Sequence, residues 1–335
     1  MKKLRWIALV LLVATSAMTL PVVGAHAEPL VVYSGRGESL VGPIFQAFTA
    51  ESGIEVDVRY NKTPALATQV LAEGADSAAD VILLQESGYL GALAANDLLA
   101  ELPRSVLGQV DGRFRDPAGR WIGTSGRARV LVYNTTKLQP GDLPRSLDQL
   151  RDPKWKGKLG WAPGNASFQS HVSALRHLWG LDRTREWLEA VGRNEPTVYP
   201  KNSPQVRAAS TGEIQIGWVN HYYLLRAKKA NPKLPAANYN FPAVSDAGNI
   251  LMLAGVAVRQ GTPSSEAALE LVSFLTGPTA QQMFAQNGFE YPTRIGVATH
   301  ADVPPLEMLE LANVDQAALT DVAPTLKLLR ELGLQ

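Results

Sequence analysis

Residues 30–60, LVVYSGRGESLVGPIFQAFTAESGIEVDVRY, decide the fold. They begin with a short apolar strand at Leu30–Tyr33. A helix follows, with Ser39 as its cap, apolar residues on one face and Gly53 at its end. Residues 54–60 then alternate apolar and charged side chains, which is typical of a half-buried strand. A strand, a helix and a second strand in this order predict an α/β fold with a largely parallel sheet.

The same alternation continues along the chain. Further helices are predicted over residues 64–73, from about Ser87, at 146–150 and 167–179, from Ser203, from about Tyr222, and at 266–275 and 279–287, the last ended by Gly288; further strands are predicted at 81–84, 130–133, 214–219 and 251–258. At roughly 100–200 residues for each domain, the chain is long enough for two. No linker or repeat separates the blocks, so we expect two lobes joined by strand crossovers.

The first 27 residues are predicted to be a signal peptide. Lys2, Lys3 and Arg5 precede an apolar run from Trp6 to Leu20, and small residues follow at Ala25 and Ala27. A membrane anchor is the alternative, but polar residues interrupt the run and a cleavage site follows it. We therefore expect an exported protein that is cleaved after residue 27.

Composition narrows the class of protein further. The chain has 32 basic and 31 acidic residues, and no block of like charge. It also contains no cysteine. Near-neutral charge argues against nucleic acid or an anionic membrane as a partner. Without cysteine there is no lipid attachment site and no thiolate for catalysis or soft metals. These features predict a free periplasmic protein, expected to be a monomer.

Two adjacent tyrosines, Tyr222 and Tyr223, end the segment 220–223, NHYY, which directly follows the predicted strand at 214–219. At a strand-to-helix turn, neighbouring side chains can converge. A phenol, with an ordinary pKa of about 10, binds as phenolate only when a strongly charged cation displaces its proton. Ferric iron is the common biological ion with that charge. The alternative is that the tyrosines open a helix, with one ring packed inward and the other in water.

Other candidate site residues lie in turns next to predicted strands. The first turn contains Arg36, which can hold an anion, and Glu38, a hard oxygen donor. Its alternative is an ordinary glycine-rich turn. Arg127 and Arg129 precede the predicted strand at 130–133, and alternation places them on the same side, where one can line the cleft while the other meets a surface carboxylate. Asn165, Ala166 and Ser167 precede or open a helix and resemble an anion cradle, as does Asn202; a simple helix cap is the alternative.

Catalytic motifs are not evident in the sequence. We find no G-x-S-x-G, H-E-x-x-H, Walker or G-x-G-x-x-G signature. His171 and His177 are six residues apart on one predicted helix, which is not the spacing of a shared face. We therefore expect that the protein is not an enzyme.

Seven segments in order resemble the ferric-iron-binding branch of the periplasmic proteins of bacterial ABC importers. They are LVVYSGRGESLVGPIFQAF, VDVRYNKTPALATQVLAEG, ADVILLQESGYLGAL, GTSGRARVLVYNTTKL, DPKWKGKLGWAPGNASFQ, YPKNSPQ and VNHYYLLR. The resemblance implies a type II periplasmic-binding-protein fold, also called a Venus flytrap. Its expected parts are an N-terminal lobe of residues 28–126 and 252–300, a C-terminal lobe of 127–251, and a C-terminal helical segment of 301–335.

The resemblance also implies a ligand set. Tyr222 and Tyr223 correspond to the paired iron-binding tyrosines of the family, and Glu38 is added as an oxygen ligand. Carbonate or phosphate is the implied companion anion, and the positions implied to hold it are Arg36, Arg127 or Arg129, Asn165, Ala166, Ser167, Asn202 and Asn220. The chain departs from the family at three places. Where some members have a His or Tyr ligand after the arginine, it has Gly37 and Glu38. It has Gln85 where some members use a Glu ligand, and Ala166 where some use a third tyrosine.

The implied function is to carry ferric iron to an inner-membrane ABC permease. Iron would favour closure, because only the closed state assembles both halves of the site. One alternative keeps the fold but binds a small organic or inorganic anion. A more distant alternative is an exported hydrolase, which would need a nucleophile and a base within hydrogen-bond reach.

Overall fold

The computed structural model describes residues 28–334. The predicted signal peptide, residues 1–27, lies outside the described residues. Within residues 28–334, the helices are too short or too polar to cross a membrane.

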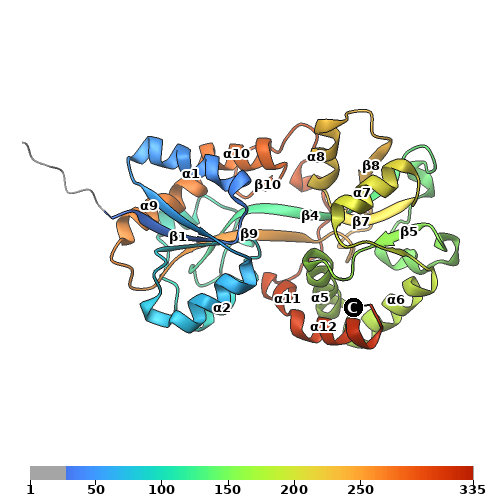
Figure 1. Cartoon of the computed structure of the whole chain (residues 1–335), viewed down its shortest axis with the longest axis horizontal. Helices are drawn as coiled ribbons and strands as arrows, with labels where there is room; N and C mark the ends of the chain where they lie inside the picture. Colours follow the sequence, from blue (N-terminus) through green and yellow to red (C-terminus); the bar gives the residue numbers. More distant parts are fainter. Residues whose placement is uncertain (1–27, 335) are drawn as a thin grey trace, which may run out of the picture.

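The described strands form one extended mixed sheet in the order β2-β1-β3-β9-β4-β7-β5-β6, and β8 and β10 also pair with β4 (Figure 1). Their bounds are β1 (Leu30–Ser34), β2 (Val56–Tyr60), β3 (Val81–Leu84), β4 (Ile122–Asn134), β5 (Leu159–Trp161), β6 (Thr197–Val198), β7 (Ile216–Asn220), β8 (Ala236–Tyr239), β9 (Leu251–Val258) and β10 (Tyr291–Pro292). The strands predicted at 81–84 and 251–258 are confirmed residue for residue.

The sheet is less parallel than predicted. β1 runs parallel to β2 and β3, and β5 runs parallel to β6 and β7. However, β9 is antiparallel to β3 and β4, and β4 is antiparallel to β7, β8 and β10. The chain passes between the lobes along β4 and β9 themselves, so these strands do not need the crossover helix that a parallel neighbour requires.

β4 belongs to both lobes. Its 13 residues are all buried. The strand pairs with β9 as far as Ala128 and with β7 from Arg129 onward. In Figure 1, β4 and β9 run side by side from one lobe to the other. The change of pairing partner after Ala128 lies close to the lobe boundary predicted at 126/127, which stays a proposal.

Helices cover the sheet in both lobes. Their bounds are α1 (Glu38–Ser52), α2 (Thr63–Glu73), α3 (Gly88–Ala95), α4 (Arg104–Leu107), α5 (Ala166–Trp179), α6 (Leu181–Arg193), α7 (Asn202–Thr211), α8 (Tyr222–Ala230), α9 (Ser265–Leu275), α10 (Pro278–Gly288), α11 (Gln316–Thr320) and α12 (Val322–Glu331). In the first lobe, α1, α9 and α10 pack together. In the second lobe, α11 and α12 pack on α5 (Figure 1). α11 also contacts α3 of the first lobe. The C-terminal segment therefore touches both lobes.

Several helix ends differ from the prediction. α1 begins at Glu38 after Gly37, so Ser39 lies inside the helix and is not its cap. α7 begins at Asn202 and not after Ser203. α10 ends with Phe289 in the left-handed conformation, at φ 58°, one residue beyond the predicted stop. The end of α1 at Gly53, with φ 74°, is confirmed; this conformation costs glycine no steric strain.

Two large apolar clusters stabilise the lobes. One contains the inner face of α1, with Val41, Ile44 and Phe48 fully buried. The other is rich in tryptophan and contains Trp187 and Trp218, whose ring centroids are 5.6 Å apart. Each large apolar side chain contributes about 1.5–3 kcal/mol when it is fully buried. These clusters hold the loops at the strand ends in fixed positions.

Candidate ligand site between the lobes

A cavity of about 580 Å³ lies between the loops of the two lobes. The first lobe contributes Arg36, Gly37, Ser39, Leu40, Gln85, Asn287, Phe289 and Glu290, and the second contributes Tyr222, Arg226, Lys229 and Ala230. Arg36, Gln85 and Tyr222 each follow the carboxyl end of a strand, namely β1, β3 and β7. Ligands of open α/β sheets bind at such ends.

Tyr222 and Tyr223 are the first two residues of α8. Their rings stack, with centroids 4.4 Å apart and planes inclined by 29°. The guanidinium carbon of Arg226 lies 4.4 Å from the centroid of the Tyr222 ring. Tyr222 is buried and lines the cavity, and Tyr223 is half-buried. The turn after β7 thus brings both phenols together beside the cavity.

The Tyr222 phenol is held in its neutral form. Burial raises its pKa, and the neighbouring Tyr223 adds to this effect. The positive charge of Arg127 acts in the opposite direction. In the absence of a cation, the Tyr222 hydroxyl therefore keeps its proton at neutral pH. A strongly charged metal ion would have to displace it.

Arg36 is buried in the turn between β1 and α1. A Cβ atom at Gly35 would collide with Thr63, so only glycine lets this turn pass so close to α2. The Arg36 guanidinium forms an ion pair with Glu290, with Nη2 and Oε1 2.5 Å apart. Both side chains are almost fully buried. The predicted anion-binding arginine thus already has a carboxylate partner.

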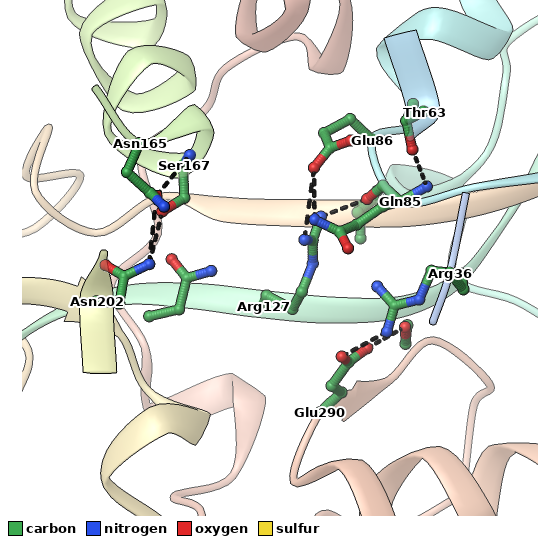
Figure 2. Close-up of polar contacts among 12 residues, drawn as sticks. Arg36, Thr63, Gln85, Glu86, Arg127, Asn165, Ser167, Asn202 and Glu290 are labelled. Carbon is green, nitrogen blue, oxygen red and sulfur yellow. Dashed lines mark hydrogen bonds and ion pairs between the residues drawn. The ribbon is translucent and has the colours of Figure 1, made fainter. Parts of the chain in front are cut away.

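Arg127, on β4, is 1% exposed and also faces the first lobe. Its Nη2 donates to the Gln85 carbonyl oxygen, and its Nη1 lies 3.6 Å from Glu86 Oε1. Figure 2 shows Arg127 with Gln85 and Glu86 on one side of the site, and Arg36 with Glu290 nearby. The cationic groups of this wall are therefore matched by carboxylates.

Arg129 lies two residues further along β4 and is completely buried in the second lobe. It donates to Asn220 Oδ1 and to the Trp218 carbonyl oxygen, both at 2.9 Å, to Ser167 Oγ at 3.2 Å, and to His171 Nδ1 at 3.4 Å. Within the described residues, no carboxylate forms an ion pair with it. Burial lowers the pKa of Arg129 to about 9. The group remains a cation at neutral pH.

The predicted anion cradle gathers around Arg129. Asn165 caps α5, because its Oδ1 accepts from the Ser167 backbone N–H at 3.1 Å and from Ser167 Oγ at 2.6 Å. Asn202 Nδ2 lies 3.1 Å from Ser167 Oγ. Ala166, the first residue of α5, is exposed. Figure 2 shows Asn165, Ser167 and Asn202 together on the side of Arg127 opposite Arg36 and Glu290.

Glu38 is placed differently from the other predicted ligands. It is exposed at the start of α1 and does not line the cavity, whereas its neighbours Gly37 and Ser39 do. The first-turn position directs this carboxylate to solvent near the helix dipole. Within residues 28–334, no group of three or more histidine or carboxylate side chains could hold a metal ion.

Sequence reasoning missed two residues of this site. Glu290 is the one carboxylate among the described residues that line the cavity. His171, considered from the sequence only for its spacing from His177, is fully buried, and its Nδ1 accepts from Arg129 Nε. Burial lowers the pKa of His171 well below its usual value, and the charge of Arg129 adds to the shift. Neither residue stands in a local motif that would have indicated its position.

A second cavity, of about 660 Å³, lies along α8. His221, Leu224, Lys228 and His300 are among the residues that line it. Its lining contains none of the predicted ligand residues, so the cavity that Tyr222 lines is the candidate site.

Comparisons with known proteins define the class and then the family. Iron-bound HitA from Pseudomonas aeruginosa superimposes with a TM-score of 0.83 at 31% identity, over 91% of this chain and 99% of that one. A Trichodesmium protein, IdiA (FutA), in complex with iron and citrate, superimposes with a TM-score of 0.80 at 26% identity, over 92% of this chain and all of that one. The chain thus has the type II periplasmic-binding-protein fold.

Sequence relatives agree with this fold. The Fe(3+)-binding periplasmic protein of Serratia marcescens is 33% identical over 92% of this chain and 91% of its own length. Residues 76–318 match the family of bacterial extracellular solute-binding proteins. The chain belongs to that family.

Proposed function

We propose that this protein is a periplasmic carrier that binds ferric iron and delivers it to an inner-membrane ABC permease. The observation that carries the proposal is the stacked pair of Tyr222 and Tyr223 beside the interlobe cavity. The relatives support the cargo and the compartment, since the Serratia marcescens protein is named as an Fe(3+)-binding periplasmic protein and the HitA structure contains iron.

The chemistry of the phenols supports a trivalent metal. Burial raises the pKa of Tyr222, so a weakly charged ion would not displace its proton. Ferric iron, a hard cation, favours phenolate oxygen over soft donors. Tyr222 and Tyr223 would supply two negative charges from adjacent positions. Two phenolates leave one positive charge of Fe³⁺ unbalanced, so a further anionic ligand is required.

A small anion is the proposed companion of the metal. Asn165, Ser167, Asn202 and Asn220 surround Arg129, which is a buried cation with no carboxylate partner in the described chain. Ala166 would offer its backbone N–H at the start of α5. Carbonate or phosphate matches this set of donors, and the Trichodesmium structure contains citrate together with iron. Arg36 and Arg127 were expected as anion contacts too, but a carboxylate already pairs with each, so we propose Arg129 as the main anion contact.

Closure of the lobes would complete the site. Glu38 is exposed in this structure, so it becomes a ligand only if lobe or loop movement brings it to the cavity. Iron binding favours the closed state because the ligand contacts both lobes there and one lobe in the open state. The permease would recognise the closed form of the monomer. The relatives are solute-binding proteins, which supports binding and not hydrolysis as the role.

Ferric titration of the purified iron-free protein tests the proposal. We expect one equivalent of iron to produce a visible phenolate-to-iron charge-transfer band in the presence of carbonate or phosphate. Tyr222→Phe and Tyr223→Phe should each remove most of the band and weaken iron binding at least about a hundredfold, because each removes an anionic ligand. Tyr239→Phe is the matched control, since Tyr239 lies on β8 and does not line the cavity.

The second candidate function is the binding of a small anion without iron. The absence of a carboxylate beside Arg129 in the described chain favours it. A protein that stays colourless with ferric iron but binds phosphate or citrate tightly would replace the first proposal by this one. An iron band that is unchanged in both phenylalanine variants would overturn the assignment of the tyrosines.

A further inference from the structure

Glu290 is a buried carboxylate whose position the ligand set does not explain. It lies between α10 and β10, is 2% exposed and lines the cavity. Its Oε1 is 2.5 Å from Arg36 Nη2, and its Oε2 accepts from Ser125 Oγ at 2.5 Å. Both oxygens are thus engaged by the first lobe. A buried carboxylate is costly unless it is paired in this way.

The backbone around Glu290 is fixed from both lobes. Phe289 adopts the left-handed conformation at φ 58°, which is sterically unfavourable for a residue with a side chain. Its carbonyl oxygen lies 2.6 Å from Nε2 of His221, the residue that precedes the tyrosine pair. Positions 289 and 290 therefore connect the turn that carries Arg36 to the turn that carries Tyr222.

The paired charges beside the cavity affect where an anion can bind. Arg36 and Glu290 form one pair, and Arg127 and Glu86 form a second. Arg36 Nε is buried and has no hydrogen-bond partner within the described residues. An anion that approached Arg36 would gain a donor but would also meet the carboxylate of Glu290. The negative charges of the anion and of Glu290 would repel each other strongly in a buried site.

We propose that Glu290 is a positioning residue that neutralises Arg36 and thereby directs the anion to the polar cluster around Arg129 in the second lobe. The inference rests on the proposed function for the choice of ligand and adds a determinant of where that ligand binds. Arg36 and Arg129 are both anion contacts to judge by the sequence, and the charge of Glu290 leaves only Arg129 free to bind the anion. The same carboxylate holds Arg36 in place as a hydrogen-bond donor at the edge of the cavity.

Calorimetric titration of the iron-free protein with inorganic phosphate tests this role. Glu290→Gln keeps the size of the side chain and removes its charge, so Arg36 becomes a free cation. We expect phosphate to bind roughly tenfold more tightly, or at a second site, because Arg36 would then donate a charged hydrogen bond to phosphate in place of the one to Glu290. Glu290→Asp should restore the wild-type phosphate affinity, since it keeps the charge.

Two further variants separate positioning from simple stability. Glu73→Gln removes a carboxylate that also accepts several hydrogen bonds but lies outside the cavity, and it should leave phosphate binding unchanged. Arg36→Gln/Glu290→Gln removes both charges of the pair and should bind phosphate as the wild type does. This double variant also carries the test if Glu290→Gln alone does not fold.

The outcomes are distinct. Unchanged or weaker phosphate binding in folded Glu290→Gln would overturn the inference, as would a loss of more than about fivefold in the double variant, because Arg36 would then be the anion contact. Failure of the proposed function has a different signature. It would be the absence of a tyrosine-dependent iron band in the wild type, whatever the response of Glu290→Gln to phosphate.

Discussion

Buried charge is compensated differently on the two sides of the cavity, which we call the first-lobe wall and the second-lobe wall; Arg127 and Arg129 belong to these walls but lie behind the residues that line the cavity. On the first-lobe wall, Arg36 and Arg127 each have a carboxylate partner, Glu290 and Glu86. On the second-lobe wall, Arg129 is held by neutral acceptors. Paired charges favour one fixed arrangement, whereas a buried cation that only neutral groups surround leaves room for an anionic ligand. The difference indicates that the charges of the first-lobe wall stabilise the fold, whereas the charge of the second-lobe wall is available to an anionic ligand.

The largest effect is expected from breaking the pair on the first wall. Arg36→Met leaves Glu290 buried without its partner, and we expect it to lower the free energy of unfolding by about 3–5 kcal/mol. Replacing both partners, Arg36→Met/Glu290→Met, should recover most of this loss, because an apolar pair needs no charge compensation. Urea denaturation of both variants and of Glu290→Met measures the coupling. Additive losses would show that the two residues do not act as a pair.

Removal of Arg129 should cost less and should have no rescuing partner. Arg129→Met orphans several neutral acceptors, and we expect a loss of about 2–3 kcal/mol in unfolding free energy. Adding Glu290→Gln to this variant should give additive losses, since Glu290 pairs with Arg36 and not with Arg129. Urea denaturation of the single and double variants tests this. Recovery of stability in the double variant would mean that the walls share one charge network.

Acid should loosen the second wall before the first. The folded-state pKa of His171 is far below its unfolded value of 6.5, because burial and Arg129 oppose its protonation. The folded protein therefore binds fewer protons than the unfolded chain, and stability is lost as the pH falls below 6.5. Burial raises the pKa of Glu290, but Arg36 and Arg127 outweigh burial and lower it below 4.5, so its contribution is lost only in stronger acid.

Chemical denaturation of the iron-free protein between pH 7.5 and 5 measures this order. Each such histidine contributes a slope of up to about 1.4 kcal/mol for each pH unit. His221 adds a similar contribution, since burial lowers its pKa to about 4. His171→Gln should lower the slope by the share of one histidine. Glu290→Gln should lower stability across the whole range but leave the slope between pH 7.5 and 5 unchanged, because Glu290 stays ionised there. An unchanged slope in His171→Gln would contradict the predicted order.

The smallest effect is expected at the cap of α5. Asn165→Ala removes the acceptor of the Ser167 backbone N–H and should lower the unfolding free energy by about 1 kcal/mol. Asn165→Asp should retain that cap, because an aspartate oxygen accepts the same hydrogen bond. Thermal unfolding of the two variants gives the comparison. Equal losses in both would indicate that the Asn165 side-chain amide, and not the cap, stabilises this wall.

Local patterns explain which features could be predicted. The tyrosine pair lies within three residues of the end of its strand, so the sequence alone indicated its turn. The first half of β4 was missed because Gly123, Thr124, Ser125 and Gly126 interrupt the apolar pattern, although all are buried. Glu290 could not be found, because its partner Arg36 is 254 positions away. Glu38 was expected beside Arg36, but the start of α1 directs it to solvent.

The single long strand β4 carries an arginine of each wall. Arg127 contacts the first lobe and Arg129 contacts the second, and only Ala128 separates them in the sequence. The covalent chain sets their spacing at about 6.6 Å along the strand. Movement of the lobes can therefore change what each guanidinium meets, but it changes the distance between the two backbone positions very little. β4 therefore keeps a fixed spacing between the arginine of the first-lobe wall and the arginine of the second-lobe wall.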